Sequence, residues 1–337
     1  MYAVTVDGLV PSGELGVTLP HEHLYCDLRL YCSPNDSADL PMESIPMDRL
    51  RDAPLDFRVN LDMRDEALVT EEMRAFKGFG GGAIVELSTV GLAPDHAALR
   101  RVSRAAGVHV IAGTGYYTGQ THSDELKRMS VAAIAEGMVR EIVEGDSATG
   151  IRAGIIGEIG TSAPLQASEL AVLRAAARAQ LLTNCPINIH FAPGLAEVFT
   201  VLDVLAAEGL PAFDRVVVSH ADDVLDVELH ERVMARGAVI EYDTFGNESY
   251  PSPWGKPMPT DEERVLAIAD LIRHGFLGQI LVSHDVCMRS LWLRFGGKGY
   301  VNLLDQVAVL FERAGITTTE LRRLFIDNPA RLLGFVA

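Results

Sequence analysis

The chain has 337 residues, of which 48% are hydrophobic and 22% are charged, as in a folded globular protein with a large core rather than a disordered one. Its net charge of −17 argues against general binding to nucleic acids or anionic membranes, because both need a positive protein face. The N-terminus shows no secretory signal pattern and no apolar segment is long enough to cross a membrane, so we expect a cytoplasmic protein whose four cysteines are reduced.

Strands and helices are predicted to alternate along almost the whole chain. The predicted strands are short, apolar and rich in Val and Ile, which is typical of strands buried on both faces. In chain order they are 16–19, 83–87, 109–113, 153–157, 187–190, 215–219, 238–242 and 279–283. Helical spacing of apolar residues is found over 65–77, 94–106, 123–143, 166–182, 195–208, 227–236, 261–274, 301–314 and 318–324.

Eight predicted strands separated by helices favour an α/β fold of the (β/α)8 type, the TIM barrel, and we expect residues 1–337 to form one domain. A doubly wound open sheet is the alternative, but no glycine-rich dinucleotide-binding turn follows the first strand. Three connections are long, at about 27–64, 243–260 and 286–300. Each follows the carboxyl end of a strand, so these loops are predicted to surround the substrate, with simple surface elaboration as the alternative.

Ionisable side chains stand where several predicted strands end. His21 and His23 are two residues apart, so in an extended backbone both imidazoles project to one side and Glu22 points away. The other such residues are Glu158, His190, His220 and Asp285. Four histidines and two carboxylates suit zinc, manganese, cobalt or iron, and a carboxylate can bridge two cations. We therefore predict that the six residues bind two divalent metal ions, with zinc as the first choice.

Other potential ligands are interpreted differently. Cys26 and Cys32 follow the histidine pair, but enough nitrogen and oxygen donors are present without them. His284 should point away from Asp285, and a role in supporting the site or in contacting the substrate is the alternative for it. Surface positions are predicted for the histidines in or beside helices, which are His96, His122, His230 and His274.

The motifs around these residues resemble those of the phosphotriesterase-like family within the amidohydrolase superfamily. In chain order they are PHEHL, AGIIGEIGTS, VSHADD, SHDVC, GGKGY and NPARLL. The resemblance implies a (β/α)8 barrel with a binuclear metal centre. It implies that the more buried ion is bound by His21, His23 and Asp285, that the more exposed ion is bound by His190 and His220, and that Glu158 bridges both.

The sequence departs from the family pattern at two places. Many members bridge the metals with a carboxylated lysine, but Gly157 stands at that position and Glu158 follows it. This resembles the branch with a glutamate bridge, so the site should assemble without lysine carboxylation. An Arg-Asp pair that is frequent in relatives is replaced by 93–95 (Ala-Pro-Asp), so no role is carried over for that arginine.

The resemblance also assigns one aromatic residue to the site. Tyr117 resembles a family tyrosine at the rim of the metal site, where it would donate a hydrogen bond to the substrate or the solvent between the metals. A packed rim aromatic is the alternative for Tyr117, and Tyr116 is the competing choice for the role.

Two metal ions that share a solvent molecule would generate a hydroxide nucleophile, and Asp285 could accept its proton, which predicts hydrolysis of a polar bond. The leading hypothesis, which rests on the resemblance, is a carboxylic ester or lactone. The alternatives are an amide of an N-acyl amino acid or similar small acid, and a phosphotriester as a secondary substrate. A binding protein without turnover is another class, which the complete ligand set disfavours.

The expected partner is a small molecule, without nucleic acid or membrane, and the resemblance makes a homodimer plausible. An anionic substrate is indicated if a cation of the long loops points inward, and the candidates are Lys256, Arg289, Arg294 and Lys298.

Overall fold

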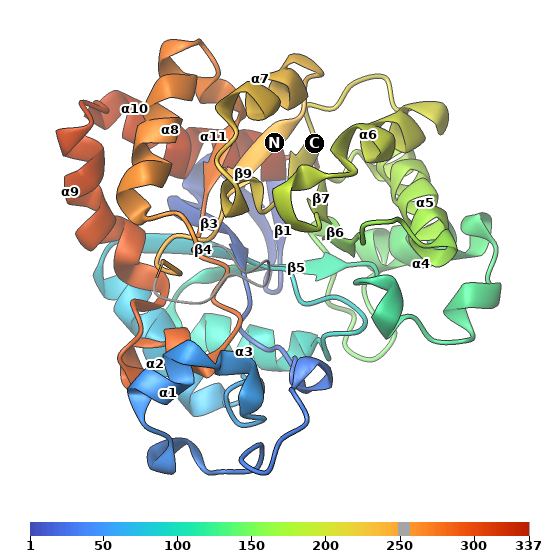
Figure 1. Cartoon of the computed structure of the whole chain (residues 1–337). Helices are drawn as coiled ribbons and strands as arrows, with labels where there is room; N and C mark the ends of the chain where they lie inside the picture. The colour runs from blue at the N-terminus through green and yellow to red at the C-terminus, as the bar shows by residue number, and fades with distance from the viewer. Residues whose placement is uncertain (249–256, 337) are drawn as a thin grey trace.

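The computed structural model describes residues 1–248 and 257–336 (Figure 1). Eight strands form one parallel sheet in which each pairs with its neighbour in chain order. They are β3 (Val17–Glu22), β4 (Gly81–Glu86), β5 (His109–Thr114), β6 (Ile155–Gly160), β7 (Ile187–His190), β8 (Val216–Val218), β9 (Val239–Tyr242) and β10 (Ile280–Val282). All eight predicted strands are therefore confirmed, with differences of a few residues at their ends.

The sheet closes between its first and last strands through a side chain and a loop. Ser283 Oγ accepts from the backbone nitrogen of His21 at 3.1 Å and lies 2.8 Å from the carbonyl oxygen of the same residue. The backbone nitrogen of Asp285 also donates to the His21 carbonyl, at 3.3 Å. These bonds complete the ring, so the predicted (β/α)8 barrel is confirmed.

Helices surround this barrel (Figure 1). They are α2 (Glu66–Gly78), α3 (His96–Ala106), α4 (Val131–Val143), α5 (Ala167–Thr183), α6 (Val198–Ala207), α7 (Val227–Ala235), α8 (Asp261–Arg273), α9 (Gln306–Arg313), α10 (Thr318–Arg322) and α11 (Asn328–Leu333). The helix predicted over 123–143 is too long, because the Ser130 side chain caps α4 by accepting from the backbone nitrogen of Ala133. The first long loop carries the short helix α1 (Met47–Asp52), at the bottom of Figure 1.

Alternating side chains of the strands build two apolar layers. On β4, Ile84 packs in the large cluster between barrel and helices, whereas Ala83 and Val85 pack in a separate cluster with inward residues of β5 and β6. Ala3 and Leu333 belong to this second cluster and come from the two ends of the chain. The amino end of the barrel is thus closed by the terminal elements, which leaves the carboxyl ends of the strands for polar groups.

The N-terminal element is a hairpin that the sequence did not reveal. Its strands are β1 (Tyr2–Thr5) and β2 (Gly8–Pro11), which pair in antiparallel register. Tyr2 also pairs with Val336, so the chain termini lie side by side (Figure 1). Within the described ranges, no helix has the length and apolar character that a membrane span requires.

Candidate metal centre

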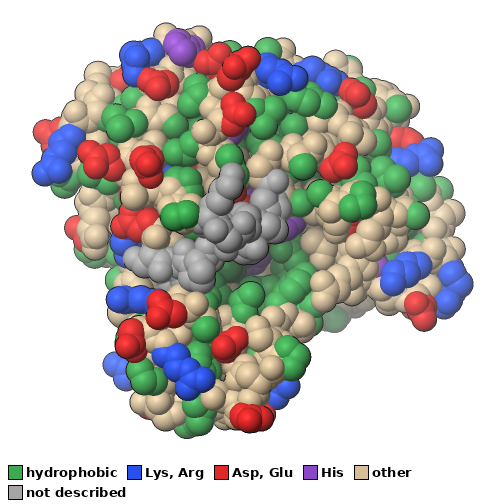
Figure 2. Space-filling view, in the orientation of Figure 1, with side chains coloured by type: hydrophobic (Ala, Val, Ile, Leu, Met, Phe, Trp, Pro, Cys, Tyr) green, Lys and Arg blue, Asp and Glu red, His purple; other side chains and the backbone are tan. Residues whose placement is uncertain are grey.

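The six predicted ligand residues meet at the carboxyl ends of the barrel strands. They lie at the end of β3 or just after it (His21 and His23), within β6 (Glu158), at the end of β7 (His190), and in the loops after β8 (His220) and β10 (Asp285). Figure 2 shows histidine side chains in a hollow near the middle of the viewed face. His190 and Asp285 are the more exposed members, at 22% and 18% of their side chains, so solvent reaches the site beside them.

Glu158 lies between the histidines. Its Oε1 atom is 2.6 Å from His190 Nδ1 and 3.1 Å from His220 Nε2. Its Oε2 atom is 3.7 Å from His23 Nε2, and Oε1 is 3.8 Å from His21 Nε2. One carboxylate therefore faces imidazoles from both sides of the centre, which is the arrangement that a bridging ligand needs.

Two groups in this cluster could each hold a metal ion, because their donor atoms lie within 4.8 Å of one another. We call them subsite A (His21, His23 and Asp285) and subsite B (Glu158, His190 and His220). In subsite A, His21 Nε2 is buried and makes no hydrogen bond, and the buried Oδ1 atom of Asp285 lies 3.2 Å from His23 Nε2. A buried polar atom without a partner costs about 1–3 kcal/mol. A cation would satisfy His21 Nε2, so the donor set fits a metal ion.

Gly157, which the resemblance aligns with a lysine bridge, has no room for a side chain. Its φ is +141°, a conformation that favours glycine, and a Cβ atom would lie 2.4 Å from the carbonyl oxygen of Asn188. Lysine at this position is therefore sterically excluded, and Glu158 supplies the carboxylate in the middle of the cluster.

Glu22, between the two histidines, points away from the cluster as predicted but supports it from behind. Its Oε1 atom accepts from Ser283 Oγ at 2.8 Å and from the backbone nitrogen and Nδ1 of His284 at 3.0 and 2.8 Å. Its Oε2 atom accepts from the backbone nitrogen of Val286 at 2.9 Å. Asp285, between these two residues, has a φ of +50°, which is unfavourable for a residue with a side chain. Glu22 thus holds the backbone on both sides of a strained site residue.

Glu241 and Asp243 are the supporting residues that the sequence analysis missed. Asp243 Oδ2 is 3.1 Å from His21 Nδ1, and Asp243 Oδ1 is 2.9 Å from His220 Nδ1. Glu241 Oε2 is 3.0 Å from His21 Nδ1. Because Glu241 and Asp243 are two residues apart at the end of β9, the alternation that paired His21 with His23 would have placed both carboxylates inside the barrel.

Opposite charges in the cluster shift the ionisation of its members. Burial favours a lower pKa for His21 and His220, but the charge and hydrogen bonds of Asp243 outweigh it, and both pKa values are raised well above their ordinary range. Burial likewise favours a higher pKa for Glu158, but His190 and His220 lower it well below the usual value. The cluster therefore attracts positive charge, and a metal ion would compete with protons for it.

Tyr117 is the tyrosine that the fold brings to the cluster. Its hydroxyl is 3.5 Å from both ring nitrogens of His190, and the two rings meet edge to face with centroids 4.9 Å apart. Burial raises the pKa of this hydroxyl well above its usual value, so it stays a proton donor. The ring of Tyr116 instead packs against His122, with centroids 6.4 Å apart.

Two of the histidines predicted to be surface groups are buried, so that prediction is wrong for them. His122 lies between Ser168 Oγ at 2.9 Å and the carbonyl oxygen of Tyr117 at 2.8 Å. His230 is fully buried with its Nδ1 2.9 Å from the hydroxyl of Tyr242. Helical periodicity did not separate their inward faces from solvent. The remaining two, the half-buried His96 and the exposed His274, lie outside the cluster.

Two of the loop cations, Lys298 and Arg289, are engaged outside the cluster. Lys298 Nζ binds Glu248 Oε1 at 2.7 Å and Asp261 Oδ2 at 2.9 Å. Arg289 Nε donates to the backbone of the first loop, at the carbonyl oxygen of Asp62. The other two candidates are Arg294, which lines a cavity between the first loop and α2, and Lys256, which lies outside the described residues.

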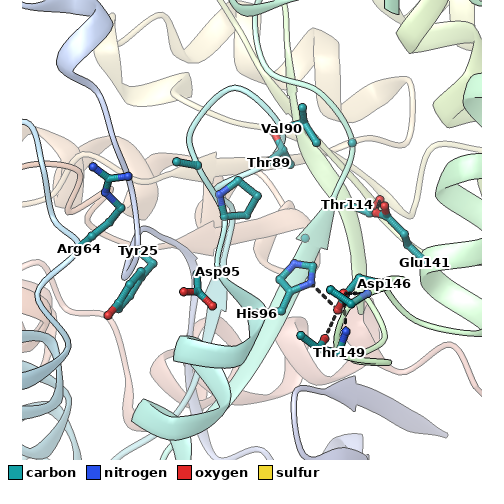
Figure 3. A pocket seen from close by; sticks show the side chains of 15 residues that line it. Tyr25, Arg64, Thr89, Val90, Asp95, His96, Thr114, Glu141, Asp146 and Thr149 are labelled. Atoms are coloured by element: carbon teal, nitrogen blue, oxygen red, sulfur yellow. Dashed lines mark hydrogen bonds and ion pairs between the residues drawn. The ribbon is translucent and has the colours of Figure 1, made fainter.

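A separate cavity of about 540 Å³ lies outside the barrel, beside the starts of the loops that follow β4 and β5. Figure 3 shows His96 and Asp146 on its wall, joined by a hydrogen bond between Nδ1 and Oδ2 of 3.3 Å. None of the six cluster residues lines it. This cavity is therefore distinct from the candidate metal centre.

Comparison with known proteins gives whole-chain similarities. The sequence matches the model of the phosphotriesterase family over residues 1–333. It is 37% identical to the N-acetyltaurine hydrolase of Tetraodon nigroviridis over 340 residues, which cover 98% of this chain and 97% of that protein. The structure of a resiniferatoxin-binding protein from Rhodobacter sphaeroides superposes with a TM-score of 0.94 at 34% identity, covering 98% of this chain and 94% of the other. A mutant of a PTE-like lactonase from Deinococcus radiodurans gives 0.79 at 26% identity, covering 98% and 100%.

Proposed function

Because this chain belongs to the phosphotriesterase family, we propose that it is a metal-dependent hydrolase that cleaves the amide bond of an N-acylated small acid. The prediction of a hydrolase is confirmed by the relatives, and the reaction and the ligand roles are our proposal. The observation that carries it is the pair of facing subsites around Glu158, with a buried and unsatisfied nitrogen, Nε2, on His21. We also propose that one domain contains the whole site, since its residues run from His21 to Asp285.

The residues of subsite A would hold one divalent ion and those of subsite B the other, with Glu158 reaching both. Ions at these positions would supply Lewis-acid chemistry, which acidifies water and polarises a carbonyl oxygen. Zinc is our first choice because the donors are imidazoles and carboxylates, and these also suit manganese, cobalt and iron.

Residues of the chain would then transfer the proton and bind the substrate. Asp285 is partly exposed at the cluster, so its carboxylate is placed to accept a proton from attacking water and to return it to the leaving group. An amine is a poor leaving group unless it is protonated, and the backbone clamp of Glu22 keeps this carboxylate in place. The hydroxyl of Tyr117 would donate a hydrogen bond to the substrate from above His190.

The amide is favoured over the ester or lactone by the relatives. The hydrolases that are 37% and 36% identical over 98% of this chain are named for N-acetyltaurine, an amide with a small acid. The lactone remains a second candidate, because solved lactonases that are 26% identical share the fold along the whole chain. The cytoplasmic location and the homodimer stay predictions.

A substrate panel on metal-loaded protein tests the proposal. Initial rates are compared for N-acetyltaurine, N-acetylglycine, a γ-lactone and an aryl phosphotriester, with chelator-treated protein as the control. We expect the highest kcat/KM for an N-acetyl acid and loss of turnover after metal removal. Turnover of the lactone alone would replace the amide by the second candidate, and activity that survives complete metal removal would contradict the metal centre.

A further inference from the structure

A single buried carboxylate stands behind both subsites. Asp243 is fully buried, and its two oxygens face Nδ1 of His21 in subsite A and Nδ1 of His220 in subsite B, at 3.1 and 2.9 Å. We propose that Asp243 is a shared positioning residue, which fixes the tautomer and the orientation of one histidine in each subsite. This inference rests on the proposed metal centre, and it identifies the residue that contacts a histidine of both subsites.

The tautomers follow from the chemistry of the partners. An ionised carboxylate is only an acceptor, so the Nδ1 atoms that face Asp243 must each carry a hydrogen. In a neutral imidazole the opposite nitrogen then has a free lone pair. For both histidines that nitrogen is Nε2, which faces Glu158 at 3.8 Å from His21 and 3.1 Å from His220. Asp243 therefore turns the electron-donating edge of both rings toward the metal centre.

Asp243 also fixes the backbone from which the second ring projects. His220 has a φ of +56°, a left-handed conformation, and its backbone nitrogen donates to the Asp243 carboxylate at 3.0 Å. The carboxylate is itself held, because the backbone nitrogen of Asp243 donates to Asp222 Oδ1 at 3.0 Å. Asp222 Oδ2 accepts from Arg264 Nε at 2.7 Å, and both of these side chains are fully buried. The position of Asp243 is thus set by a network that anchors it to α8.

The support is unequal for the two histidines. His21 Nδ1 has a second acceptor, Glu241 Oε2, at 3.0 Å. At His220 Nδ1 the acceptor is Asp243. Loss of Asp243 should therefore weaken subsite B more than subsite A. Loss of Glu241 should affect subsite A alone. The two variants should therefore differ in which metal ion they bind more weakly.

Asp243 could instead be a direct ligand, since it forms a third close group with His21 and His220. Its oxygens, however, are engaged by both Nδ1 atoms and by the backbone nitrogen of His220. Unlike His21 Nε2, they are not among the buried atoms that lack a partner in the described structure. The imidazole rings also separate Asp243 from Glu158, so a positioning role fits the geometry better than ligation.

Metal affinities of single variants test the inference. Asp243→Asn keeps the shape but turns an amide NH₂ toward one of the Nδ1–H groups, so one histidine loses its acceptor. Zinc and cobalt dissociation constants are measured for both ions by competition with a chromophoric chelator, for wild type, Asp243→Asn and Glu241→Gln. Asp203→Asn is the matched control, because it makes the same change at an exposed carboxylate on α6, outside this network.

We expect Asp243→Asn to weaken binding by about 10–100-fold, as is usual for partners behind metal-binding histidines, and mainly for the ion of subsite B. Glu241→Gln should weaken the binding of one ion only, and Asp203→Asn should leave both affinities within about twofold of wild type. Unchanged affinities in Asp243→Asn, or an equal loss in Asp203→Asn, would overturn the inference. Wild-type protein that binds no metal would instead overturn the proposed function.

A measurement on the wild type covers the case in which Asp243→Asn does not fold. Protein with ¹⁵N-labelled histidine is loaded with zinc, and the tautomers of His21 and His220 are read from the coupling of each ring nitrogen to the ring protons. We expect a hydrogen on Nδ1 in both. A hydrogen on Nε2 of either residue would overturn the inference, whether or not the variants are stable.

Discussion

Replacing Glu22 by glutamine is expected to loosen the backbone around Asp285 without changing the size of the side chain. Glu22 accepts four hydrogen bonds, three on Oε1 from Ser283 and His284 and one on Oε2 from Val286. Glutamine has one acceptor oxygen, which we expect to face the three donors. Its NH₂ group then meets the backbone N–H of Val286, and neither of these two donors has an acceptor.

The magnitude follows from these contacts. An unsatisfied buried donor costs about 1–3 kcal/mol, and hydrogen bonds to a charged group are about twice as strong as neutral ones. Glu22→Gln loses one hydrogen bond and also removes the negative charge that strengthens the other three. The variant should therefore have a free energy of unfolding about 2–5 kcal/mol lower than wild type. Because Asp285 lies in this segment with a φ of +50°, we also expect a lower kcat and a lower affinity for the metal ion in subsite A.

Denaturant unfolding of metal-free protein measures the stability change, and chelator competition measures the metal affinity. Glu71→Gln, on the exposed side of α2, is the matched control and should change stability by less than about 0.5 kcal/mol. A loss below about 1 kcal/mol in Glu22→Gln, together with unchanged affinity in subsite A, would refute the reasoning.

Further predictions concern three other side chains. Arg264→Met leaves the Asp222 carboxylate buried without its cation, so we expect about 3–5 kcal/mol of destabilisation by denaturant unfolding, and a loss under about 1 kcal/mol would contradict this. Tyr117→Phe should lower kcat/KM by about three- to tenfold, as for one lost hydrogen bond, with both metal ions retained; unchanged kinetics would remove the tyrosine from the site. Burial lowers the pKa of His230 to about 4, so the unfolded chain binds its proton first as pH falls below about 6.5, and stability should fall between pH 6.5 and 4. Relative to His230→Gln, wild type should lose about 2 kcal/mol more between pH 6.5 and 5, and parallel losses would contradict the cause.

The barrel and the positions of the cluster residues could be predicted because each depends on a local pattern. Short runs of Val and Ile mark strands buried on both faces, and one rule of parallel sheets brings their carboxyl ends together. His190 and Asp285, more than ninety residues apart, meet for this reason. The N-terminal hairpin lacked such a mark, because its strands contain no run of Val and Ile and β2 has no buried residue.

Glu22 could not be identified in the same way. It acts on Ser283 and Val286 across the seam where the first and last strands close, and no local pattern encodes that contact. Glu241 and Asp243 do follow the alternation along β9, but Asp243 stands directly after the strand and was assigned only to the predicted loop 243–260. His230 was misplaced because a helix has one buried face, and its sequence alone did not show on which side the histidine falls.

Anomalous diffraction from crystals of the zinc-loaded protein, recorded at the zinc edge, tests the central claim most directly. The account predicts two anomalous peaks, one among His21, His23 and Asp285 and one between His190 and His220, with the Glu158 carboxylate between the peaks. A single peak, or a peak bound by Asp243 in place of Glu158, would contradict it.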